Sequence, residues 1–151
     1  MKDLKSSCRL AIVQAAPVMF DKDACLQKAL RLIGEAAASG VELIVFPELF
    51  LPGYPYGLTF GYTVGSRSPT GREDWKVYSD NSILADGEEM QQLIRCAMEN
   101  NVYLSFGYSE RDKLTATLYN SNMLISPAGE AINHRKLKPT GAERLVWGDG
   151  N

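Results

Sequence analysis

An amphipathic segment followed by an unbroken apolar run constrains the fold of this chain more than any other feature. Residues 22–39 carry apolar side chains at helical spacing, at Leu26, Leu30, Ile33 and Ala37. Asp21 is placed to cap this helix, and Ser39-Gly40 is placed to end it. The next run, VELIVF at 41–46, has the length and composition of a buried strand. With a strand over 9–16, these segments predict a βαβ unit and an α/β fold with both faces of the sheet at least partly covered.

The same pattern returns further along the chain. Asp86 and Glu89 resemble a capping box at the start of a helix over 86–100, and VYLSFGY at 102–108 predicts the following strand. Residues 117–136 then predict two strands joined by a turn at Pro127-Ala128-Gly129-Glu130. We therefore expect an antiparallel pair at the edge of the sheet.

Residues 47–85 lack periodicity and are rich in Pro, Gly, Tyr and Ser, which predicts a long loop. A loop of this length in a compact domain is usually functional or packed on a partner. Its aromatic side chains allow two readings, an apolar substrate pocket or packing of the loop onto the body of the domain: Tyr54, Tyr56, Phe60, Tyr62 and Trp75.

Composition narrows the possible partners. The chain has 151 residues, 45% of them hydrophobic and 23% charged, which fits one globular domain. The net charge is −2, and the single dense basic run is RKLK at 135–138, so a nucleic acid partner is not expected. No apolar run approaches the roughly 18 residues of a membrane span, so no membrane partner is expected either.

The cysteine and histidine content argues against a metal or cofactor. Cys8, Cys25 and Cys96 are widely spaced, and His134 is the only histidine, so neither a metal site nor a Ser/His/Asp triad is indicated. No P-loop or GxGxxG motif is present, so no nucleotide cofactor is expected. The odd, unpatterned cysteines favour a reducing cytoplasm.

Glu48 is the first candidate catalytic residue. It directly follows the carboxyl end of the VELIVF strand, where α/β folds place functional groups. Its neighbours Phe46, Leu49 and Phe50 predict a desolvated carboxylate suited to general base catalysis. The alternative is a glutamate that simply turns out to solvent at a strand end.

Lys136 and Glu143 are the second candidate set. Lys136 ends the predicted edge strand, Pro139 stops regular structure, and Glu143 follows on a short turn. Lys136 and Glu143 could then face the same end of the sheet as Glu48. The lysine and the two carboxylates would form a charge-paired network. The alternative is a solvated basic surface stretch.

Three long motifs carry a resemblance to a known family: FPELFLPGYPY at 46–56, LYNSNMLISPAGE at 118–130 and HRKLKPTGAERLVWGDG at 134–150. In this order they resemble the nitrilase branch of the carbon-nitrogen hydrolase (nitrilase) superfamily, and the resemblance runs from Arg9 onward. It implies half of an α-β-β-α sandwich, with a mixed β-sheet and helices on one face.

The resemblance also implies roles for particular residues. By motif position, Glu48 matches the general base, Lys136 the catalytic lysine and Glu143 the supporting carboxylate of a Glu-Lys-Cys mechanism that uses no cofactor. Tyr54, Tyr56 and Trp147 are the expected substrate pocket. Where many nitrilases have His before Ala-Glu-Arg, this chain has Gly.

The family's nucleophilic cysteine would lie a little downstream of the WGDG stretch, and this chain stops at Asn151. None of Cys8, Cys25 and Cys96 matches it by motif, and each is expected to be structural or merely exposed. We therefore expect residues 1–151 to be one partial domain, truncated before the nucleophile and inactive alone. Such a half should expose apolar surface and self-associate or bind a complementary half.

Three functions stay open. The first is hydrolysis of an organic nitrile to a carboxylic acid and ammonia, and the GYPY and ERLVWG segments favour it. The second is a non-catalytic half that acts as a folded interaction module or as one piece of a split protein. The third is an amidase or carbamoylase of the same superfamily.

Overall fold

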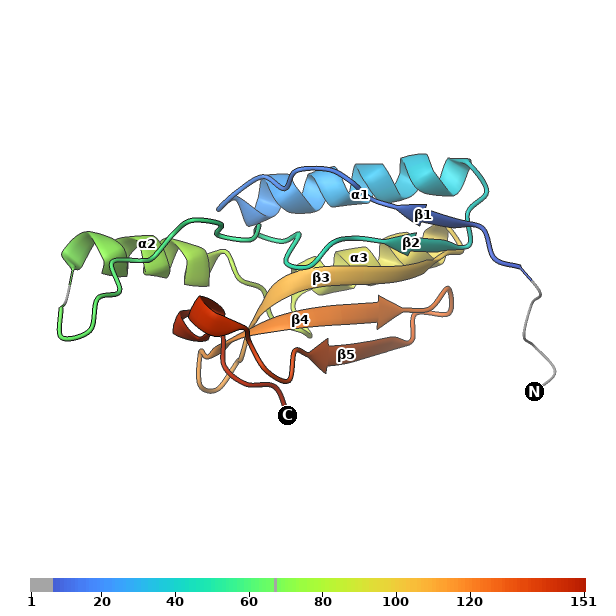
Figure 1. Cartoon of the computed structure of the whole chain (residues 1–151). Helices are drawn as coiled ribbons and strands as arrows, with labels where there is room; N and C mark the ends of the chain where they lie inside the picture. The colour runs from blue at the N-terminus through green and yellow to red at the C-terminus, as the bar shows by residue number, and fades with distance from the viewer. Residues whose placement is uncertain (1–6, 67) are drawn as a thin grey trace.

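Five strands form a single mixed sheet in the computed structural model, which describes residues 7–66 and 68–151 (Figure 1). The strands lie side by side in chain order: β1 Leu10–Ile12, β2 Leu43–Val45, β3 Tyr103–Arg111, β4 Leu118–Ile125 and β5 Ala131–Arg135. The first three are parallel, and β4 and β5 are antiparallel additions at one edge. The predicted mixed sheet and its antiparallel edge are therefore confirmed.

The helices are α1 Lys22–Ala38, α2 Pro69–Asp80 and α3 Glu88–Glu99, with a short 3₁₀ helix, η1, at Gly141–Leu145. As expected, Asp21 caps α1, because its side chain accepts a hydrogen bond from the Ala24 N–H. The capping box expected at α3 is wrong. Gly87 is its N-cap, without a side-chain bond, and the Glu89 carboxylate pairs with Lys22 of α1 instead.

The sequence does not predict helix α2, because residues 47–85 lack periodicity and indicate one long loop. Ser68 caps it by accepting a hydrogen bond from the Gly71 N–H at 3.1 Å, and Pro69 occupies its first turn, where a proline costs no hydrogen bond. The helix buries little of its surface, so its sequence shows no clear apolar stripe. In Figure 1 it projects beyond the end of the sheet.

Helices α1 and α3 pack on one face of the sheet, and Figure 1 shows α3 behind the strands. Ile33 and Leu93 from these helices are fully buried with Ile44, Leu104 and Phe106 from the strands. This arrangement confirms helices on one face.

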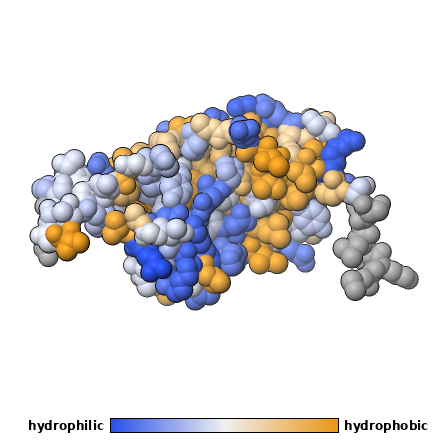
Figure 2. Space-filling view, viewed as in Figure 1, coloured by the Kyte–Doolittle hydropathy of each residue, from blue (hydrophilic) through white to orange (hydrophobic). Residues whose placement is uncertain are grey.

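The opposite face of the sheet is open, so the expectation that both faces are partly covered is wrong for the described residues. Its large apolar side chains are exposed, namely Leu10, Ile12, Tyr103, Leu124 and Ile132. Figure 2 shows apolar side chains gathered over the strands on this face.

A buried polar network ties the three strands at the edge of the sheet together on the helix side. Glu110 of β3 is 2% exposed, and its carboxylate accepts hydrogen bonds from Arg135 Nε at 3.0 Å and Ser121 Oγ at 2.6 Å. Asn133 Nδ2 donates to the same carboxylate at 2.7 Å. The network fixes the register of β5, the strand that leads into Lys136.

No helix within residues 7–66 and 68–151 is long and apolar enough to cross a lipid bilayer.

Candidate active site

The three charged residues expected to act together do meet, at the end of the open face where the parallel strands finish. Lys136 Nζ lies 2.9 Å from Glu48 Oε1 and 2.9 Å from Glu143 Oε2. Glu48 follows β2, Lys136 follows β5, and Glu143 lies in η1. The lysine ammonium therefore sits between two carboxylates contributed by distant parts of the chain.

Glu48 is held in place by an unusually close backbone approach. A Cβ atom on Gly107 of β3 would lie 2.3 Å from the Pro47 carbonyl oxygen and 2.8 Å from Glu48 Cα. Glycine is therefore required there, because any side chain would push the Pro47–Leu49 segment away. Leu49 takes a left-handed conformation, with φ of 51°, while its side chain is fully buried. The Glu48 carboxylate is therefore carried by a sharp turn whose backbone packs against β3.

The prediction that the Glu48 carboxylate is desolvated is wrong. Its side chain is 48% exposed, because the turn directs Phe46 and Phe50 into the core and the carboxylate onto the open face. It is nevertheless not a free surface group. Its Oε1 accepts hydrogen bonds from Lys136 Nζ and from Asn120 Nδ2, the latter at 2.6 Å.

Glu143 is the least exposed of the three charged residues, with its side chain 10% exposed. Burial by itself would raise its pKa, but hydrogen bonds from the Thr140 N–H, Lys136 and Tyr54 outweigh burial and lower the pKa below the usual value. The Thr140 bond, 2.7 Å long, closes a capping box at the start of η1. Glu143 is therefore a fixed, ionised partner for the lysine.

The Glu143 carboxylate acts to raise the pKa of both Lys136 and Tyr54. Burial tends to lower the pKa of Lys136, but its bonds to Glu143 and Glu48 more than offset this, so the pKa is raised and the ammonium stays protonated. Burial and the neighbouring Glu143 raise the pKa of Tyr54 to about 12, so its hydroxyl remains a donor, 2.8 Å from Glu143 Oε1.

Asn120 of β4 is a site residue that the sequence argument missed. Its side-chain amide contacts Glu48, and its backbone carbonyl accepts the Lys136 N–H at 2.7 Å. The alternation of LYNSN places Asn120 on the open face, and the hairpin register places it beside Lys136. That register was the signal that could have found it.

The three expected pocket residues line one cavity of about 210 Å³ next to Glu143. Tyr54 forms part of its wall, and Tyr56 is 91% exposed at its rim. Trp147 is buried, and its indole N–H donates to Ser109 Oγ at 3.1 Å. Phe60 also lines the cavity.

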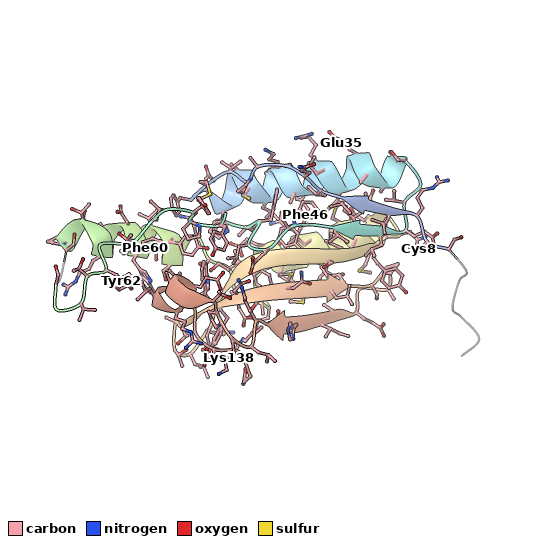
Figure 3. All side chains as sticks on the ribbon, viewed as in Figure 1. Cys8, Glu35, Phe46, Phe60, Tyr62 and Lys138 are labelled. Carbon is pink, nitrogen blue, oxygen red and sulfur yellow. The ribbon has the colours of Figure 1, made fainter. Side chains whose placement is uncertain are left out.

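None of the three cysteines lies at the site. Cys25 and Cys96 belong to α1 and α3, on the covered face, and Cys25 is fully buried with its thiol donating to the Phe50 carbonyl. Cys8 precedes β1 and lies at the other end of the molecule from Phe60 (Figure 3). Within the described ranges, no group of three or more His, Cys, Asp and Glu side chains could hold a metal ion.

Known proteins resemble this chain over almost its whole length. Residues 9–151 match the family model described as carbon-nitrogen hydrolase. The chain is 47% identical to an aliphatic nitrilase of Sinorhizobium fredii, over 95% of its own length and 46% of that protein. It is 44% identical to nitrilase 2 of Arabidopsis thaliana and to a cyanide hydratase of Stereum hirsutum, covering 95% of the chain and 42% and 37% of those proteins.

Among solved structures, Nit3 of Saccharomyces cerevisiae, a member of branch 10 of the nitrilase superfamily, superposes with a TM-score of 0.70 at 25% identity. The match covers 95% of this chain and 49% of that one. An amidase from Nesterenkonia sp. shares the fold, with a TM-score of 0.67 at 18% identity over 95% of this chain and 48% of the amidase. The chain spans less than half the length of the curated relatives described above. From the family match over residues 9–151, together with these relatives, the chain belongs to the carbon-nitrogen hydrolase family.

Proposed function

We propose that residues 1–151 form one partial domain of a nitrilase, an enzyme that hydrolyses an organic nitrile to a carboxylic acid and ammonia. The observation that carries the proposal is the placement of Lys136 Nζ 2.9 Å from both Glu48 and Glu143. The aliphatic nitrilase and nitrilase 2 among the relatives support the choice of nitrile as substrate.

The chemistry requires a thiolate, a base and a cation. A thiol loses its proton to Glu48 and attacks the nitrile carbon, and the protonated Glu48 then returns the proton to nitrogen. Two water molecules are consumed in total, one releasing ammonia and leaving a thioester, and the other releasing the acid. Lys136, kept protonated and oriented by Glu143, stabilises the negative charge that develops on the tetrahedral adducts.

This chain supplies the base and the lysine, and we propose that the thiol comes from sequence outside residues 1–151. The exposed apolar side chains of the open face support a partner for that face, either a complementary half or a second copy. No metal or cofactor has a role in these steps. The three free thiols agree with a reducing cytoplasm.

The cavity beside Glu143 is proposed to hold the organic group of the nitrile. Its walls include the rings of Tyr54, Phe60 and Trp147, which suit an apolar substituent. An amide would use the same groups, since its hydrolysis also passes through a thioester. The structural likeness to an amidase keeps amidase or carbamoylase activity as the second candidate.

The test compares ammonia release by the chain alone with release after residues 1–151 are joined to the remaining portion of the Sinorhizobium fredii aliphatic nitrilase. We expect no turnover from the chain alone and turnover of nitriles from the joined protein. Glu48→Gln and Lys136→Met should each lower that rate by about 10²-fold or more. Lys138→Met is the matched control, because Lys138 is exposed and pairs only with Asp149 among the described residues.

Three outcomes separate the candidates. Faster release from amides than from the corresponding nitriles would favour the amidase. Turnover by the chain alone would contradict an external thiol. A joined protein that folds but hydrolyses neither substrate would favour a non-catalytic interaction module.

A further inference from the structure

Asn120 is tied to both charged residues that the proposed reaction needs. Its Nδ2 atom donates to Glu48 Oε1 at 2.6 Å, and its backbone carbonyl accepts the Lys136 N–H at 2.7 Å. We propose that Asn120 is a positioning residue that commits Oε1 of Glu48 to hydrogen bonding and leaves Oε2 as the oxygen that accepts the proton. The inference rests on the proposed function, because that function makes Glu48 the base.

The two oxygens of the Glu48 carboxylate have different surroundings. Oε1 accepts from Asn120 and also from Lys136 Nζ, at 2.9 Å. Among the residues that the structure describes, no donor forms a hydrogen bond with Oε2. An oxygen that already accepts two charge-assisted or short bonds is a poorer proton acceptor than its free neighbour. The Glu48 side chain is 48% exposed, so a thiol from outside this chain can approach the carboxylate.

An asparagine suits this task because its amide donates without carrying charge. An arginine or lysine there would add a second cation beside Lys136 and make the carboxylate a weaker base. An aspartate would place a like charge against Glu48. Asn120 is only 5% exposed, so its amide is held in one orientation by the surrounding sheet.

The backbone of the same residue couples the base to the lysine. Strand β4 pairs with β5 in a register that sets Ser121 against Arg135, and Lys136 follows directly. A slip of one residue would turn the Lys136 side chain to the other face. Asn120 therefore fixes Lys136 through its carbonyl and Glu48 through its side chain.

Asn122 provides a matched control. It lies two residues further along β4, on the same face of the sheet, and its Oδ1 accepts a hydrogen bond from Ser105 Oγ at 3.1 Å. Its partner Ser105 is not one of the charged residues of the candidate site. A change that merely loosens the strand should affect both asparagine positions alike.

The test locates the deuteron of Glu48 in neutron structures of the 151-residue chain and of two variants, Asn120→Leu and Asn122→Leu, from crystals acidified until the carboxyl is protonated. We expect the deuteron on Oε2 in wild type and in Asn122→Leu, because both hydrogen bonds to Oε1 are intact there. In Asn120→Leu, Oε1 keeps only the hydrogen bond from Lys136, and we expect the deuteron to be shared between the two oxygens.

Three outcomes would each overturn the proposal. They are a deuteron on Oε1 in the wild type, a deuteron that stays on Oε2 alone in Asn120→Leu, and a deuteron shared between both oxygens in Asn122→Leu. These measurements require no turnover. A failure of the ammonia assay and a failure of this inference can therefore be told apart.

Discussion

The buried Glu110 is expected to be one of the largest single contributors to the stability of the sheet, and Glu110→Gln tests this. The carboxylate is 2% exposed and accepts bonds from Arg135, Ser121 and Asn133. Breaking a buried ion pair by removing one partner costs about 3–5 kcal/mol. Arg135 retains Asp112 at 3.2 Å and is partly exposed, so we expect a loss near the lower end, about 3 kcal/mol.

The assay is urea unfolding followed by tryptophan fluorescence, with Glu88→Gln as the control. Glu88 pairs with Arg95, and both side chains are more than half exposed, so its loss should be below about 0.5 kcal/mol. A loss in Glu110→Gln below about 1 kcal/mol, or equal to the control, would refute the reasoning.

The stability lost in Glu110→Gln should depend on pH. Burial alone would raise the pKa of Glu110, but its bonds from Arg135, Ser121 and Asn133 lower the pKa overall. The stability it contributes is therefore complete above the unfolded-state pKa of about 4.3 and is lost as the pH falls through the lower, folded-state value. The difference in unfolding free energy between wild type and Glu110→Gln should shrink as the pH is lowered below about 4.

Three further predictions concern the site and the core. Gly107→Ala should lose about 1–3 kcal/mol of unfolding free energy through its clash with the backbone at residues 47–49, whereas Gly34→Ala, which meets no atom within 4 Å, should gain up to about 1 kcal/mol in the same urea assay. Glu143→Gln should lower the Tyr54 pKa below about 12, as measured by ultraviolet titration against a Tyr54→Phe reference, because burial still raises the pKa but the neighbouring charge is removed. Cys25 should react with Ellman's reagent only after unfolding, because it has no exposed surface and burial raises the pKa of its thiol.

The parts of the fold that were predicted correctly are those in which local pattern and burial agree. Helix α1 has a cap and an apolar face that packs on the sheet, so its sequence carries the helical period. Helix α2 buries few residues, and its Ser68-Pro69 start was hidden within a run rich in Pro, Gly and Ser. A helix without a large buried face leaves no periodicity in the sequence to detect.

The sequence predicts that three charged residues of the candidate site lie together, but it predicts neither their exposure nor the neighbouring Asn120. Glu48, Lys136 and Glu143 come together as expected, because the strand ends and the short turn after β5 bring them to one end of the sheet. The exposure of Glu48 was missed because it depends on the left-handed turn at Leu49, which apolar neighbours in the sequence do not reveal. Asn120 was missed because its role depends on the register between strands.

The close contact between Gly107 and the Pro47–Leu49 segment holds Glu48 independently of the loop that carries Tyr56. Glu48 is anchored to the backbone of the central sheet, whereas Tyr56, on the rim of the cavity, is carried by an outlying loop and is 91% exposed. Under the proposed function, changes at the rim would alter which organic group is accepted without moving Glu48, the proposed proton acceptor. That division would let substrate selectivity diversify, in nature or by engineering, while the charged groups keep their positions.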